Sequence, residues 1–142
     1  FSSELELTKK KNCKMNKLIV DAAKENIFLM IISDSDIYSV TYENSKTNYE
    51  KLMILIKDFL SSKNLEIKDI SLIYLNIGPG SFAGIRTSIS IIKAISLVTK
   101  IDYYCYSFEY FKDIKKVKHE NIPSLCDKFN IKKNLINPIY IS

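Results

Sequence analysis

The glycine-proline turn at residues 77–81, Ile-Gly-Pro-Gly-Ser, constrains the fold more than any other part of this sequence. The apolar run at residues 71–77 is typical of a buried strand, and residues 82–100 follow with helical spacing after Ser81, a candidate N-cap. Glycine permits positive φ and proline cannot extend a strand ladder, so the strand must end here. The sequence therefore predicts a strand that turns tightly into a helix, which is a unit of an α/β fold.

The helix predicted over residues 82–100 is apolar on nearly every side. Its apolar residues recur on two sides, which are Ile85, Ile89 and Ile92 on one and Ile91, Ile95 and Val98 on the other. A helix with this pattern must be covered twice, once by its own sheet and once by something else.

Four further strands are predicted from shorter patterns. Apolar runs at residues 17–20, 27–32 and 37–42 indicate three strands joined by tight turns, and residues 103–106 indicate a fifth strand after the long helix. The first three strands are typical of an antiparallel meander.

Two more helices complete the predicted order β-β-β-α-β-α-β-α. Residues 47–50, Thr-Asn-Tyr-Glu, have the form of a capping box, and Leu52, Leu55, Ile56 and Phe59 follow at helical spacing. Ser107 is placed to cap a short last helix. We predict a mixed five-stranded sheet of order 3-2-1-4-5, in which the right-handed crossover rule places the first two helices on one face.

Composition narrows the classes of function. The 142 residues carry a net charge of +5, but Arg86 is the only arginine, which fits a lysine-rich surface better than a phosphate-reading face. His119 is the only histidine, so no clustered histidine metal site can be built and any catalytic triad would have to use this one residue; we predict no metal site. Three cysteines far apart in sequence suit a reduced, cytoplasmic protein, and no apolar run reaches the ~20 residues that span a bilayer.

The chain divides into three predicted segments. Residues 1–14 are polar and precede Met15, where we expect the true start, so they are predicted to be a disordered or misassigned extension. Residues 15–111 hold the predicted sheet and helices. Residues 112–142 form a short basic extension, too short for a second full domain.

The glycine turn and the start of its helix resemble the signature of a known family. Residues 77–86, Ile-Gly-Pro-Gly-Ser-Phe-Ala-Gly-Ile-Arg, are similar to the G-P-G-S-F-T-G-L-R run of the TsaB family, with Ala83 in place of the usual threonine. Residues 18–21 resemble the family's first strand, residues 103–109 the end of its first domain, and residues 137–141 its terminal tail. The resemblance implies a ribonuclease H-like or actin-like domain, in a shortened member that lacks most of the second domain.

The resemblance also implies a division of labour. TsaD is the threonylcarbamoyltransferase that modifies the adenosine beside the anticodon of transfer RNA, TsaB is its non-catalytic partner, and the ATPase TsaE joins them. We therefore expect a scaffold subunit that forms a heterodimer with TsaD and meets tRNA only through the complex. We expect no cofactor bound by this chain alone. ATP or ADP could bind at the interface shared with TsaD. The apolar residues predicted at that interface are Met53, Ile56, Ile91, Ile95 and Val98.

The glycine turn has two interpretations. Gly78, Gly80, Ser81 and Gly84 could cradle a phosphate at the helix N-terminus, or they could let strand and helix pack closely and present the helix to a partner. We favour the second, because no lysine follows in the manner of a Walker loop. Arg86 could contact the phosphate of a nucleotide shared with TsaD or form an ion pair across the subunit interface. A plain surface arginine is the third alternative.

Asp21, at the end of the first predicted strand, resembles the acidic residue that can hold hydrated magnesium in actin-like ATPases. The family usually has threonine or serine next, whereas this chain has Ala22 and Ala23, which offer no hydroxyl. We favour a turn-capping role for Asp21.

Two other functions remain as alternatives. The chain could be a nucleotide-binding actin-like ATPase, or a degenerate module whose helices pair with those of a second copy. Separately, Lys115, Lys116 and Lys118 could approach transfer RNA held by the complex, although such a run is usually solvated.

Overall fold

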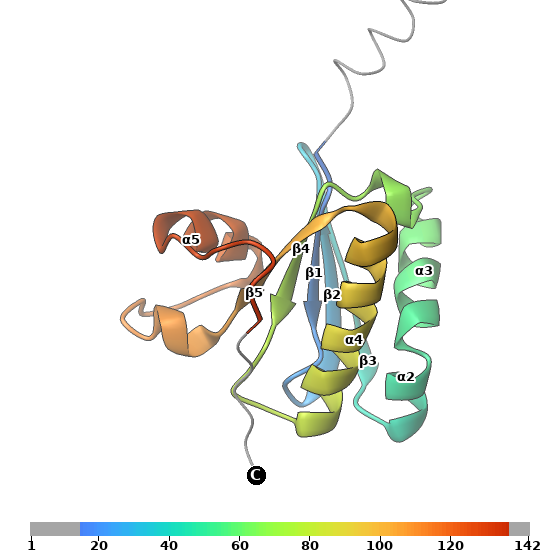
Figure 1. The fold of residues 1–142 in the computed structure, drawn as a ribbon, viewed down its shortest axis with the longest axis horizontal. Helices are drawn as coiled ribbons and strands as arrows, with labels where there is room; N and C mark the ends of the chain where they lie inside the picture. Colours follow the sequence, from blue (N-terminus) through green and yellow to red (C-terminus); the bar gives the residue numbers. More distant parts are fainter. Residues whose placement is uncertain (1–14, 137–142) are drawn as a thin grey trace, which may run out of the picture.

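The computed structural model describes residues 15–136, which form a five-stranded sheet with helices on both faces (Figure 1). The predicted extension at residues 1–14 and the family-like tail at residues 137–141 lie outside the described residues. The strands are β1 (Lys17–Asp21), β2 (Asn26–Ile32), β3 (Ile37–Glu43), β4 (Leu72–Asn76) and β5 (Asp102–Tyr106). Their order across the sheet is β3-β2-β1-β4-β5, which confirms the prediction.

The sheet is mixed because two kinds of connection build it. Tight turns join β1, β2 and β3 as antiparallel neighbours, whereas helical crossovers place β4 and β5 parallel to β1. The central strands β1 and β4 are nearly all buried, since both faces of the sheet are covered there. The edge strand β3 turns only Val40 and Tyr42 toward the core.

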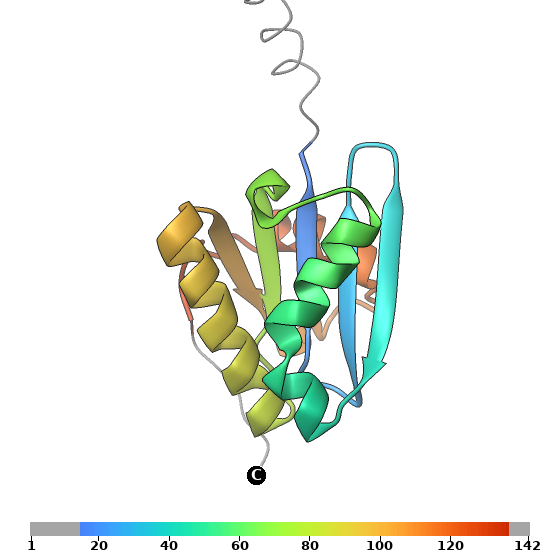
Figure 2. The same ribbon diagram turned by 90° about the vertical axis from the view of Figure 1, so that its right-hand side faces the viewer.

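Three helices cover one face of the sheet, as Figure 2 shows: α2 (Lys46–Glu50), α3 (Leu52–Ser62) and α4 (Phe82–Thr99). The core beneath them joins Ile56 and Ile92 from the helices with Leu18, Val20 and Ile73 from the strands. The structure thus confirms the prediction that both crossovers lie on one face.

The first of these crossovers begins earlier than predicted and is interrupted. The N-cap is Ser45, whose hydroxyl accepts a hydrogen bond from the Asn48 N–H at 3.1 Å, so the predicted capping box at residues 47–50 is wrong. Lys51 leaves helical geometry, with φ −107° and ψ 24°, and divides the predicted single helix into α2 and α3. The hydroxyls of Ser45 and Thr47 can both accept a hydrogen bond from a free N–H at a helix start, and the helix begins after Ser45, which comes first in the chain.

The opposite face of the sheet is covered by the last part of the described chain. A 3-10 turn, η2 (Phe108–Phe111), a second, η3 (His119–Asn121), and α5 (Ile122–Lys128) lie there, to the left of the sheet in Figure 1. Ser107 caps η2 through the Glu109 N–H, which confirms the predicted short helix in its 3-10 form. A second core forms from Ile19, Met30, Tyr74, Tyr106, Phe111, Ile122, Leu125 and Cys126.

The division of the chain at Phe111 stays a prediction. Residues on both sides of that boundary share the second core, because Ile122 and Cys126 pack with Tyr74 and Tyr106 of the sheet. A short 3-10 turn, η1 (Ile67–Asp69), precedes β4.

Helix α4 is long and apolar enough, by length and composition, to cross a membrane. The core helix of a soluble protein passes the same test, and α4 packs Ile85, Ile92 and Ile95 inward. Its apolar character is therefore weak support for a membrane role.

Candidate functional site

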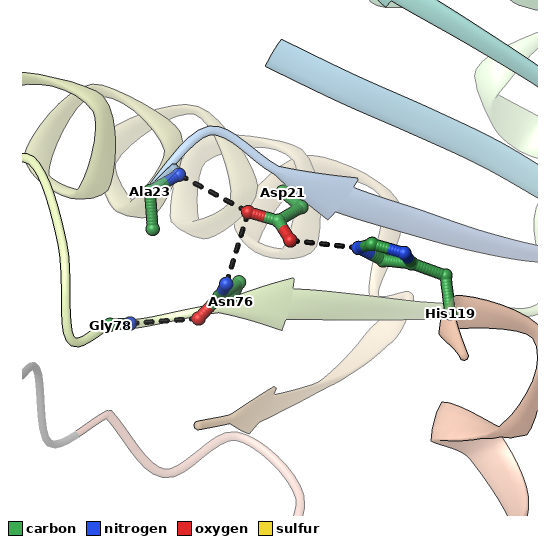
Figure 3. A network of polar contacts seen from close by, with 5 residues as sticks. All are labelled: Asp21, Ala23, Asn76, Gly78 and His119. Carbon is green, nitrogen blue, oxygen red and sulfur yellow. Dashed lines mark hydrogen bonds and ion pairs between the residues drawn. The ribbon is translucent and has the colours of Figure 1, made fainter. Parts of the chain in front are cut away.

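Two polar residues meet where the central strands end. Asp21 is the last residue of β1 and Asn76 the last residue of β4. These strands are parallel neighbours, so their carboxyl ends lie at the same edge of the sheet. Figure 3 shows the two side chains facing each other. Asp21 is only 2% exposed.

Asp21 and Asn76 tie two loops together. Asp21 Oδ1 accepts hydrogen bonds from the Ala23 N–H at 3.3 Å and from Asn76 Nδ2 at 3.0 Å. Asn76 Oδ1 in turn accepts from the Gly78 N–H at 2.9 Å, as Figure 3 shows. This geometry agrees with the turn-capping role that we favoured for Asp21.

The second carboxylate oxygen of Asp21 meets His119. His119 Nε2 lies 2.8 Å from Asp21 Oδ2, and its ring centroid lies 4.2 Å from that of Phe28 and 5.8 Å from that of Phe108. An ionised carboxylate can only accept, so the pair forms a hydrogen bond in the tautomer that places the proton on Nε2. Sequence reasoning missed this contact, because 98 positions separate the residues and the only signal was that the chain has a single histidine.

Tyr106 adds a neutral polar group beside Asp21. Burial raises the pKa of Tyr106 well above its ordinary value, and the charge of Asp21 raises this pKa further. Within residues 15–136, its hydroxyl is fully buried and has no hydrogen-bond partner. The phenol therefore stays protonated at neutral pH.

The cysteines of the described chain are buried and free. Burial raises the pKa of Cys105 to about 12 and, with Asp127 nearby, that of Cys126 to about 12. Neither thiol is available as a thiolate nucleophile at neutral pH. Among residues 15–136, no group of three His, Cys, Asp or Glu side chains could hold a metal ion.

The glycine turn packs against the loop after β1. A Cβ atom on Gly80 would lie 2.0 Å from the Ala23 carbonyl oxygen, and one on Gly84 would lie 1.8 Å from the Ala22 carbonyl oxygen. Gly78 has φ 116°, a conformation that favours glycine, and the Gly78–Pro79 peptide is cis. The glycines therefore allow a close approach of two backbones.

Three N–H donors of this turn bond to other groups of the protein. The Ser81 N–H donates to the Ala23 carbonyl oxygen at 2.8 Å, and the Gly84 N–H donates to the Ser81 hydroxyl at 3.3 Å. The Gly78 N–H is held by Asn76. These bonds favour the packing interpretation of the turn over a phosphate cradle, which needs free N–H groups. Arg86 lies outside the turn, with its guanidinium 5.5 Å from the Phe82 ring centroid.

Two adjoining hollows lie between α4 and the helices beside it, and together we name them the helix groove. The hollow between α3 and the second half of α4 holds about 410 Å³ and is lined by Met53, Lys57, Ile67, Ile91, Ala94, Ile95, Val98 and Thr99. The hollow between α2 and the first half of α4 holds about 700 Å³ and is lined by Lys46, Tyr49, Glu50, Met53, Ala83, Arg86, Thr87, Ser90 and Ile91. Met53 and Ile91 line both hollows. The first hollow is mostly apolar with Lys57 at its side, and the second carries Lys46, Glu50 and Arg86.

The helix groove unites four of the five residues predicted at a partner interface. Met53, Ile91, Ile95 and Val98 line its apolar half, and Val98 is 81% exposed. Ile95 is buried and forms part of the floor rather than the exposed rim. Ile56 is fully buried against the sheet, so its prediction as apolar surface is wrong: it belongs to the core side of α3.

Comparisons with known proteins find similarity to a TsaD family model and to two proteins named TsaB. The family model described as "TsaD: tRNA N6-adenosine threonylcarbamoyltransferase" matches residues 40–107. The chain is 30% identical over 87 residues to "tRNA threonylcarbamoyladenosine biosynthesis protein TsaB" of Buchnera aphidicola subsp. Schizaphis graminum. It is 26% identical over 84 residues to the protein of the same name from Buchnera aphidicola subsp. Acyrthosiphon pisum. The chain is TsaB-like.

A solved structure shows the same fold. "YeaZ from Pseudomonas aeruginosa" superposes with a TM-score of 0.61 at 17% identity, over 66% of this chain and 44% of that one. This likeness confirms the actin-like, ribonuclease H-like α/β fold predicted for the TsaB-like chain.

The matches are partial on both sides. They cover 61% and 59% of the TsaB-like chain, which spans 41% and 38% of the length of the two curated relatives. The matched family model includes the helix groove residues of α3 and α4 and the glycine turn, because all of these lie within residues 40–107.

Proposed function

We propose that this TsaB-like chain is a non-catalytic scaffold subunit in the biosynthesis of threonylcarbamoyladenosine in tRNA, docking onto a TsaD-type threonylcarbamoyltransferase in the cytoplasm. The helix groove carries this proposal, because it presents Met53, Ile91 and Val98 as apolar surface beside two packed helices. The curated relatives are named for this biosynthesis.

The match to the TsaD family model supports docking through helices. A TsaD-type protein shares the region that corresponds to residues 40–107, so it is expected to carry a similar pair of helices beside a glycine turn. Two related domains can pack these pairs against each other, ridges into grooves, in a near-symmetric arrangement. TsaE, tRNA and an ATP or ADP at the shared interface would then join through the assembled pair.

The hydrogen bonds at the strand ends support the scaffold role. Asp21 has hydrogen bonds to Ala23, Asn76 and His119, so its carboxylate holds loops together. The N–H groups of Gly78, Ser81 and Gly84 are likewise held by the protein. These groups favour a structural role over chemistry, and the chemistry is assigned to the partner.

Co-purification with the TsaD protein of the same organism tests the proposal, with Val98→Asp as the variant. Val98 is 81% exposed, so the isolated variant should unfold within about 0.5 kcal/mol of the wild type. At a buried interface the new carboxylate would be desolvated, and we expect affinity to fall about 30-fold or more, equivalent to about 2 kcal/mol. Titration calorimetry gives the dissociation constant.

Ile37→Asp is the matched control. Ile37 is an exposed apolar residue, 49% accessible, on the edge strand β3. It alternates with Val40 and Tyr42, which face the core under α3, so it points to the other face of the sheet. Its affinity for TsaD should match the wild type. Equal binding by Val98→Asp and Ile37→Asp would contradict docking through the helix groove.

Two measurements separate the alternatives. If sedimentation of the chain alone reveals a homodimer, and Val98→Asp dissociates it, the result would favour a self-pairing module. Binding of magnesium ATP by the chain without a partner would favour an actin-like ATPase.

A further inference from the structure

Positive charge is concentrated in the layer that covers the second face of the sheet. Residues 112–133 contain seven lysines against three carboxylates, Asp113, Glu120 and Asp127, a surplus of four. The whole chain of 142 residues has a surplus of only five. We name residues 112–133 the lysine layer.

The lysine layer is anchored by apolar residues, so its charges are held on a folded surface. Ile114 and Val117 are partly buried and pack against the second core, whereas the lysines around them are exposed. Of the seven lysines, only Lys133 has an ion pair within the described part of the chain, with Asp102 at 3.3 Å. The other six are Lys112, Lys115, Lys116, Lys118, Lys128 and Lys132, all exposed.

The layer and the helix groove lie on opposite faces of the sheet. In Figure 1, α5 and the segments around it lie to the left of the strands, and α3 and α4 lie to the right. A protein seated in the helix groove would therefore leave the lysine layer open to a second, anionic partner.

We propose that the lysine layer binds the phosphate backbone of RNA, an inference that rests on the proposed function in tRNA modification and names a direct contact for this chain. Lysine ammonium groups act as point charges for phosphates, and each neutralised phosphate releases counterions, which makes binding strongly dependent on salt. Contacts to the backbone position an RNA without reading its sequence.

Binding of a fluorescent tRNA anticodon stem-loop to the full chain, followed by anisotropy, tests this contact. With about four phosphate contacts, we expect affinity to fall roughly 100-fold between about 50 and 200 mM salt. The variant K115E/K116E/K118E should lose at least 10-fold in affinity at the lower salt concentration and show a smaller salt slope. Circular dichroism checks that it remains folded.

The triple variant K51E/K57E/K93E makes the same change of charge on the opposite face. These lysines are exposed on or beside α3 and α4, and they take part in no ion pair among residues 15–136. It should bind the stem-loop within about 3-fold of the wild type, apart from the general effect of net charge.

Three results would overturn the proposal. The wild type could fail to bind the stem-loop at the lower salt concentration, or both triple variants could lose affinity equally, which would assign the effect to net charge. Vesicles of equal parts phosphatidylcholine and phosphatidylglycerol could displace the RNA at matched anion concentration, which would assign the layer to a membrane surface. Failure here stays distinct from failure of the proposed function, because K115E/K116E/K118E leaves the helix groove intact and its binding to TsaD can be measured separately.

Discussion

At the scale of single residues, the pair formed by Asp21 and His119 links the two halves of the chain. Asp21 comes from the first strand and His119 from η3, and their side chains meet at 2.8 Å in a place where Asp21 is nearly fully buried. A buried carboxylate oxygen without a donor costs free energy, so the histidine holds the C-terminal layer on the sheet.

His119→Ala should therefore destabilise the fold. The change removes the donor to Asp21 Oδ2 and the ring contact with Phe28, and we expect the free energy of unfolding to fall by about 2–3 kcal/mol. Urea unfolding measures this. Lys118→Ala, an exposed neighbour, should change the same quantity by less than about 0.5 kcal/mol, and equal values for the two variants would show that the pair contributes nothing.

At the scale of elements, the turn between β4 and α4 is shaped by the backbone it touches. Gly84 lies in the first turn of α4, where alanine would ordinarily stabilise a helix by about 1 kcal/mol. The Ala22 carbonyl oxygen lies where the new Cβ would go, and a backbone atom between a strand and a turn cannot move cheaply. The steric effect should outweigh the gain in helix propensity.

We expect Gly84→Ala to lower the free energy of unfolding by about 2 kcal/mol, because overpacking against a fixed backbone costs about 1–3 kcal/mol. Thermal and urea unfolding check the value. Ser90→Ala, at an exposed position of the same helix, serves as the control and should be close to neutral. A more stable Gly84→Ala protein would mean that the turn has room to open.

At the scale of the whole molecule, two cores share one sheet. The first lies under α3 and α4, and the second is closed by Phe111, Ile122 and Cys126 against Tyr74 and Tyr106. Fully burying one large apolar side chain contributes about 1.5–3 kcal/mol, whereas a domain is stable by only about 5–15 kcal/mol in total.

A chain that ends at Phe111 should therefore lose its fixed tertiary structure. It would lack Ile122, Leu125 and Cys126, and the aromatic side chains of the second core would meet water. Near-ultraviolet circular dichroism should weaken and urea unfolding should become broad, in comparison with the full chain. A shortened chain that unfolds as cooperatively as the full one would instead make residues 15–111 a domain of their own.

The candidate site shows where prediction from sequence stops. The glycine turn, the end of β1 at Asp21 and four apolar residues of the groove could be predicted, because each depends on a local pattern. Ile56 was predicted at the interface although it shares the helical spacing of Leu52, Leu55 and Phe59, and the structure buries that whole side of α3 against the sheet.

The sequence by itself indicated the strands and the tight turn into α4, because hydrophobic period and glycine geometry act over short stretches. Once the strand order 3-2-1-4-5 is assumed, crossover handedness gives the side of the first two crossovers. Only the tertiary structure decided that His119 meets Asp21, that α5 closes the second face, and that Ala22 and Ala23 lie against the glycine turn. The reason is physical: these contacts join segments far apart in the chain, and each depends on the packing of everything between them.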